Sequence, residues 1–163
     1  MGFSRDPTVA LVFEVEGHRY GVDTAYVEQI VRAVLPVRLP HAPAVIVGVI
    51  NVRGQVVPLL DLRARFALPA RALCADEVFL IVRTARQRLA LRGDRSTELV
   101  RVPRDRLVPM HDTSPRARYA AGTAVLPDGL LVICDIDAFL DEAEQQSLAL
   151  ALARQQHGDE VEP

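Results

Sequence analysis

The stretch that decides the fold is Val45-Ile46-Val47-Gly48-Val49-Ile50-Asn51-Val52-Arg53-Gly54-Gln55-Val56-Val57-Pro58-Leu59-Leu60-Asp61-Leu62. Its two arms are rich in β-branched residues, which favour extended strands. Between the arms, Gly54 can adopt a positive φ at no steric cost, and Asn51 can hydrogen-bond the turn backbone. The stretch therefore predicts a β-hairpin with its turn at Asn51-Val52-Arg53-Gly54.

The second arm of this hairpin recurs near the end of the chain. Val56-Val57-Pro58-Leu59-Leu60-Asp61-Leu62 aligns with Leu130-Leu131-Val132-Ile133-Cys134-Asp135-Ile136, so that Asp61 matches Asp135. A looser match joins residues 20–30 to residues 89–100, with Glu28 over Glu98. Together these matches predict an internal repeat.

The repeat predicts a mainly β fold. We expect two related β-subdomains, over about residues 9–76 and 77–142, each a five-stranded barrel built from hairpins. Short helices should accompany the strands, one of them running from Asp23 to about Arg32 because its apolar residues keep helical spacing. Residues 1–8 are expected to be a flexible leader, and residues 143–163 a C-terminal helix with a frayed acidic tail.

Composition and charge exclude several classes of protein. The chain has 163 residues, of which 50% are hydrophobic, so it can bury a sizeable core. Nineteen basic and 21 acidic residues give a net charge of -2, so the chain has no excess of positive charge for binding nucleic acid or an anionic membrane. The longest apolar run, Ala42 to Ile50, is too short to cross a membrane. We therefore expect a cytoplasmic protein that is not membrane-embedded and binds no nucleic acid.

Residues that could carry catalysis are scarce. The sequence has no phosphate-binding glycine loop, no zinc-protease motif and no nucleophile elbow, and all its basic residues are arginine. Cys74 and Cys134 lie far apart, without metal-ligand spacing. Asp135 and Asp137 could form a metal-binding or acid–base pair in a small hydrolase, or could cap adjacent turns. The repeat favours capping, so we expect no catalytic residue, no metal and no cofactor.

Arg53 is the informative side chain of the predicted hairpin. It is a long cation at the turn, between two apolar strands, without a local partner in the sequence. One interpretation is a solvated turn residue. The other is an interface anchor, because arginine is enriched at binding hot spots and pairs bidentately with carboxylates.

Several segments together point to a known family. They are Leu39-Pro40-His41-Ala42-Pro43, Gly48-Val49-Ile50-Asn51-Val52-Arg53-Gly54, Val57-Pro58-Leu59-Leu60-Asp61-Leu62, an opening hairpin over Phe13 to Val22, Val27-Glu28-Gln29-Ile30-Val31, and a closing strand over Gly129 to Leu140. With these segments the chain resembles the CheW-like adaptor domain of bacterial chemotaxis systems, from about residue 9 to 142. The spacing of Asn-x-Arg-Gly and Pro-x-x-Asp-Leu is fairly specific to that family.

The resemblance implies a fold of two small five-stranded, SH3-like β-barrels around a shared core, and a non-enzymatic role. Proteins of this family bridge chemoreceptor signalling tips to the CheA histidine kinase, through the CheW-homologous regulatory domain of the kinase, in membrane-associated receptor arrays. The family's arginine turn and the apolar groove between its barrels are implicated in these contacts. Carried over to this chain, the partner-binding residues are Asn51, Arg53 and Gly54, with Val45, Val47 and Val49 as candidate groove lining.

One segment departs from the family pattern. Arg92 and Gly93 stand where apolar strand residues are usual, although Asp94 keeps an expected aspartate. We therefore expect a less regular second barrel, or a face that meets a different partner. The departure motivates an alternative function, a CheW-like domain repurposed as a localisation or assembly factor without kinase coupling.

Overall fold

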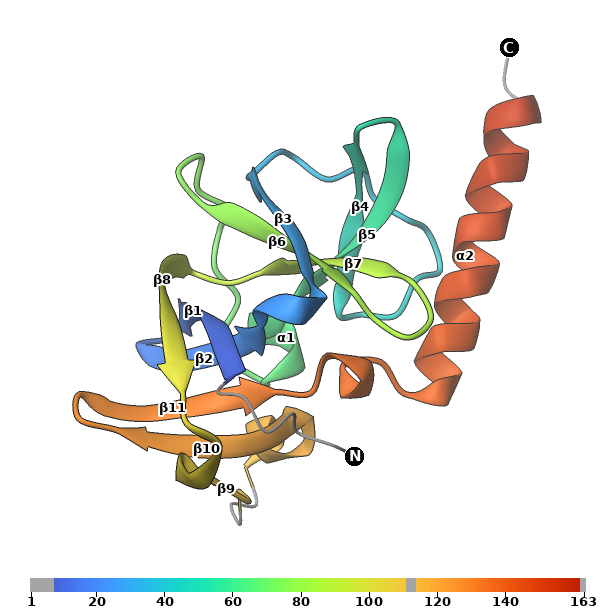
Figure 1. Ribbon diagram of the computed structural model, residues 1–163. Helices are drawn as coiled ribbons and strands as arrows, with labels where there is room; N and C mark the ends of the chain where they lie inside the picture. Colours follow the sequence, from blue (N-terminus) through green and yellow to red (C-terminus); the bar gives the residue numbers. More distant parts are fainter. Residues whose placement is uncertain (1–7, 111–113, 162–163) are drawn as a thin grey trace.

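The computed structural model describes residues 8–110 and 114–161, so the predicted leader lies outside it except for Thr8. The mainly β prediction is confirmed, because eleven strands in these residues form two sheets (Figure 1). The predicted hairpins are confirmed too, including the one that contains Arg53.

The first sheet joins the two ends of the described chain. Its six strands follow the order β8-β1-β2-β11-β10-β9. They are β1 (Thr8–Val15), β2 (His18–Asp23), β8 (Arg95–Val102), β9 (Leu107–Val108), β10 (Ala120–Leu126) and β11 (Gly129–Cys134). Neighbouring strands are antiparallel except β2 and β11, which pair in parallel at Tyr20 and Val132.

The second sheet is built from the middle of the chain. Its five strands follow the order β3-β6-β7-β5-β4. They are β3 (Val27–Arg32), β4 (Ile46–Val52), β5 (Gln55–Asp61), β6 (Val78–Arg83) and β7 (Arg88–Arg92). The parallel pair is β5 with β7, in which Leu59 lies opposite Ala90.

The helix predicted from Asp23 to Arg32 is wrong. Only the single turn η1 (Thr24–Tyr26) is helical, with its first turn capped by the Asp23 side chain. The following residues form β3, whose burial alternates strictly between half-buried and exposed positions. Their apolar spacing was compatible with either structure, and main-chain pairing with β6 decides for the strand.

The predicted repeat is present, but its halves exchange strands. Strands β1 to β5 of the first half correspond, in this order, to β6, β7, β8, β10 and β11 of the second half. When each strand is exchanged for its counterpart, the order of the second sheet becomes the order of the first five strands of the first sheet. Each sheet therefore combines strands from both halves, which differs from separate subdomains over 9–76 and 77–142. The sixth strand is β9, and in the second sheet the isolated bridge between Val37 and Val49 occupies its place.

The predicted shared core lies between the sheets. It contains buried residues of both, among them Leu11, Tyr20, Leu60, Leu80 and Val132. Each sheet also encloses a smaller apolar cluster of its own. Burial of apolar surface on both sides of each sheet explains why half of the chain is hydrophobic.

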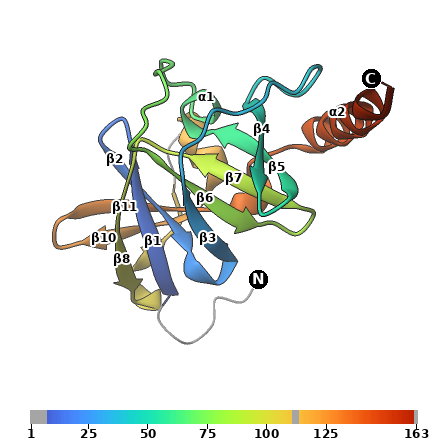
Figure 2. The same cartoon turned by 90° about the horizontal axis from the view of Figure 1, so that it is seen from above.

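Short helices close the ends of the strands. They are α1 (Leu62–Arg65), η2 (Arg104–Arg106), η3 (Pro115–Tyr119) and η4 (Ile136–Ala138), and the long helix is α2 (Glu142–Val161). The predicted C-terminal helix is thus present, and it continues through part of the predicted tail. Seen from above, α2 stands on the side of the β4–β5 hairpin (Figure 2). None of the helices described over 8–110 and 114–161 is long and apolar enough to span a membrane.

Candidate functional site

The β4–β5 hairpin ends in a tight two-residue turn at Arg53 and Gly54. Both residues have positive φ, 51° and 83°, which is typical of a type I′ turn. The backbone N–H of Gly54 donates a hydrogen bond of 2.8 Å to Oδ1 of Asn51. The structural roles predicted for Asn51 and Gly54 are therefore confirmed, and the turn holds the Cα of Arg53 in a defined position.

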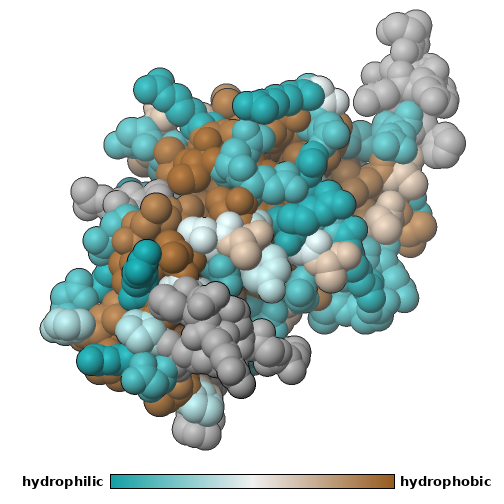
Figure 3. All heavy atoms as spheres, viewed as in Figure 1, coloured by the Kyte–Doolittle hydropathy of each residue, from teal (hydrophilic) through white to brown (hydrophobic). Residues whose placement is uncertain are grey.

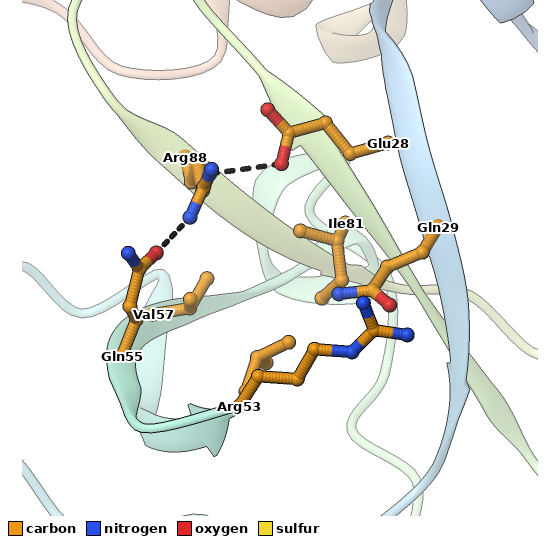
Figure 4. Close-up of a pocket in the computed structure, with 8 residues that line it drawn as sticks. Glu28, Gln29, Arg53, Gln55, Val57, Ile81 and Arg88 are labelled. Carbon is orange, nitrogen blue, oxygen red and sulfur yellow. Dashed lines mark hydrogen bonds and ion pairs between the residues drawn. The ribbon is translucent and has the colours of Figure 1, made fainter.

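A cavity of about 280 Å³ opens beneath the Arg53 side chain. It is lined by Glu28, Gln29, Val52, Arg53, Gln55, Val57, Ile81 and Arg88, from β3, β6, β7 and the hairpin. Figure 4 shows Arg53 extending across this cavity toward Gln29, while Arg88 lies between Glu28 and Gln55. Arg88 forms an ion pair of 2.8 Å with Glu28 and a hydrogen bond with Gln55. No residue in the described part of the chain forms a hydrogen bond or ion pair with the Arg53 guanidinium.

The three valines predicted to line a groove differ in burial. Val45 and Val49 belong to the shared core, with exposed fractions of 6% and 4%, so they are too buried to contact a partner. Only Val47 is exposed on the surface, at 38%. A β-bulge between Ile46 and Gly48 interrupts the alternation of β4 at Val47, and further apolar residues of the β3–β4 connection, Leu35 and Val37, are also exposed. Figure 3 shows apolar side chains gathered over β3 and β4 at the top of the view.

The expectation of an altered partner face at Arg92 and Gly93 is wrong. Arg92 ends the regular strand β7 and is only 8% exposed. Its guanidinium lies 3.3 Å from Glu77 and 3.6 Å from Asp61, and it donates to the Arg71 carbonyl. The unusual charge is therefore neutralised inside the protein.

Asp94 belongs to a neighbouring buried ion pair. Its carboxylate accepts bidentate hydrogen bonds of 2.8 and 2.7 Å from Arg63, and another from the backbone N–H of Glu16. Burial alone would raise the pKa of Asp94, but these donors outweigh it and lower the pKa below its ordinary value. The pair ties α1 to the β1–β2 turn, which is a structural role.

Asp135 and Asp137 cap backbone turns, as the repeat predicts. Asp135 accepts from the N–H of Asp137 at 3.2 Å, and Asp137 accepts from the N–H of Ala85 at 2.7 Å. No group of three or more His, Cys, Asp or Glu in the described ranges is placed to hold a metal ion. Burial raises the pKa of the Cys134 thiol, which keeps it protonated. These residues provide no second candidate site.

Sequence reasoning missed the other polar residues around Arg53. Glu28, Gln29 and Arg88 are distant from the turn in sequence and meet it only through the pairing of β3, β6 and β7. The single available signal was the alignment of Glu28 with Glu98 in the repeat. In the first sheet the corresponding pair is Glu98 with Arg19, at 2.7 Å.

Comparison with known proteins identifies the family of the chain. Residues 9–144 match the family model of the CheW-like domain. The "Chemotaxis protein CheW" of Helicobacter pylori is 30% identical over 129 residues, which cover 78% of each chain. A "Probable chemotaxis protein CheW" of Rhizobium etli is 24% identical over 139 residues, covering 84% of this chain and 90% of the relative.

A solved structure gives the same result for the fold. The crystal structure of the scaffolding protein TtCheW from Thermoanaerobacter tengcongensis superposes with a TM-score of 0.78 at 26% identity. The match covers 85% of this chain and 95% of that chain. The chain therefore belongs to the CheW family of chemotaxis proteins, whose members are scaffolds and adaptors and not enzymes.

Proposed function

We propose that this protein couples the signalling tips of chemoreceptors to the regulatory domain of a CheA-type histidine kinase, in arrays at the membrane. The observation that carries the proposal is the Arg53 turn. It is held rigidly by Asn51 and Gly54, and its guanidinium has no partner in the described residues. An arginine with free donors on a fixed turn is suited to bidentate pairing with a carboxylate of another protein.

Coupling of this kind needs no catalysis. An adaptor changes kinase activity when it holds receptor and kinase in a geometry that one kinase conformation prefers. The two interlocked sheets and their shared core make a stiff body, suited to transmitting a small displacement between two bound partners. Arg53 and the exposed Val47 would contribute to the contacts, whereas Val45 and Val49 would support them from the core.

The test compares two charge reversals in the full-length protein. Binding of the kinase regulatory domain and of a receptor-tip fragment is measured by calorimetry for wild type, Arg53→Glu and Arg106→Glu. Arg106 is an exposed arginine on η2, directly before strand β9 of the first sheet, which makes it a matched control. We expect Arg53→Glu to weaken kinase or receptor binding by about tenfold or more, and Arg106→Glu to leave both unchanged.

Absence of binding to both partners by folded wild-type protein would overturn the proposal. That result would favour a localisation or assembly factor without kinase coupling. The burial of Arg92 and Gly93 has removed the original reason for this alternative.

A further inference from the structure

A second cavity, of about 330 Å³, lies between α2 and the β4–β5 hairpin. It is lined by Gln55, Val56, Pro58, Arg83, Gln87, Arg88 and Leu152. Two of these residues, Gln55 and Arg88, also line the cavity beneath Arg53. The two cavities thus adjoin at the hydrogen-bonded residues Gln55 and Arg88, and we call them together the basic groove.

Cations outnumber anions along the basic groove. Among the described residues that line it, Glu28 is the only carboxylate, and Arg88 already pairs with it. Arg53 and Arg83 have no hydrogen-bond or ion-pair partner among the residues that the structure describes. Arg83 also lies directly opposite Arg88 across the β6–β7 pair. Like charges in this position destabilise a sheet, so an anion bound beside them would be favoured.

The excess of positive charge is not a property of the repeat. At the corresponding end of the first sheet, Arg19 pairs with two carboxylates, Glu98 at 2.7 Å and Asp128 at 3.0 Å. The position of Arg53 is taken there by Pro127. The arginine at this end of the first sheet is therefore paired with carboxylates, whereas Arg53 and Arg83 in the second sheet have unpaired hydrogen-bond donors among the described residues.

Helix α2 gives the basic groove an apolar wall. Leu148 and Ala151 are buried in the shared core and fix the helix, so that Leu152 faces the cavity. Val56, on the hairpin side, is 56% exposed. The match to the CheW-like family model ends at residue 144, so the wall formed by Leu152 lies beyond the matched domain.

We propose that the basic groove binds an acidic peptide segment of a partner protein. Carboxylates of the segment pair with Arg53 and Arg83, and an apolar side chain between them packs against Val56 and Leu152. Arginine forks match carboxylates bidentately, and the apolar contact selects peptides over small anions. Which protein supplies the segment rests on the proposed function, but the chemistry of the groove does not.

The test uses a fluorescein-labelled peptide, Gly-Glu-Leu-Glu-Leu-Glu-Gly, and the same peptide with glutamine in place of glutamate. Binding to the full-length protein is followed by fluorescence anisotropy. We expect saturable binding of the glutamate peptide alone, weakened about tenfold or more by Arg83→Glu and also weakened by Leu152→Ser. Arg106→Glu, the matched charge reversal, should bind like wild type. Arg83→Gln provides a neutral substitute if the reversal does not fold.

No binding of the glutamate peptide, or equal binding by wild type and the folded Arg83 variant, would overturn the inference. Equal binding of the glutamine peptide would do the same, because carboxylates would then not matter. The kinase is absent from this assay, so these results leave the kinase coupling to be judged by its own experiment. Kinase binding without peptide binding would reject the groove and keep the adaptor.

Discussion

The two sheets share one strand plan but use different side chains at corresponding places. The Arg19 end of the first sheet has two carboxylates around one arginine, whereas the Arg53 end of the second has three arginines, Arg53, Arg83 and Arg88, and one carboxylate. Main-chain pairing, bulges and the apolar clusters are common to both sheets. The comparison teaches that the repeat preserves what folding needs, while the polar positions at the ends of the sheets are free to diverge toward function.

The largest expected effect distinguishes Arg63 from Asp137, which occupies the corresponding position in the repeat that aligns Asp61 with Asp135. Arg63 is 8% exposed, and its removal leaves Asp94 without its bidentate partner, with only the more distant Arg71 at 3.5 Å. We expect Arg63→Met to lower the free energy of unfolding by about 3–5 kcal/mol. Asp137 is exposed and caps one backbone N–H, so Asp137→Ala should cost about 1 kcal/mol. Urea denaturation measures both.

Asp94, the partner of Arg63, provides a control through the pH dependence of stability. Because folding lowers the pKa of Asp94, its contribution to stability is present above its ordinary value of 3.8 and is lost as pH falls through the lowered value. Asp94→Asn should therefore flatten the acid limb of the stability curve. Equal losses for the Arg63 and Asp137 variants would show that the two positions remain equivalent.

Two glycines test the close approach of β9 in the first sheet and of the bridging residue Val37 in the second. A Cβ on Gly48 would lie 2.3 Å from the Val37 carbonyl oxygen, and a Cβ on Gly122 would lie 3.2 Å from that of Val108. We expect Gly48→Ala to cost about 3 kcal/mol, because backbone must move, and Gly122→Ala to cost about 1 kcal/mol. Thermal and urea unfolding of the two variants measure the difference. A larger loss at Gly122 would contradict the geometry.

The smallest effects belong to the ion pairs at the two ends of the sheets. Glu28→Gln and Glu98→Gln each remove one partially exposed pair, so each should change stability by less than about 1 kcal/mol. Their consequences for binding should differ. Loss of Glu28 releases Arg88 and should strengthen binding of the acidic peptide, whereas loss of Glu98 should leave it unchanged. Anisotropy titrations at two salt concentrations measure this, and equal responses would erase the distinction between the two ends.

Sequence patterns predicted the hairpins, the repeat and the capping aspartates, because turns and caps are encoded by neighbouring residues. The strand β3 was mistaken for a helix, since its pairing with β6 is a long-range contact that local spacing does not contain. The same limit applies to the site. Asn51, Arg53 and Gly54 were evident as one turn, but Arg83, Arg88 and Leu152 meet that turn only in the folded protein.

The exchange of strands also sets an order of assembly during synthesis. All strands of the second sheet lie between residues 27 and 92, nested within those of the first. A chain emerging from the ribosome presents the β1–β2 hairpin first, yet that hairpin has no sheet to join until β8 and β11 have been made. The second sheet can close earlier, so the apolar β1–β2 hairpin lacks its partner strands until β8 and β11 have been synthesised.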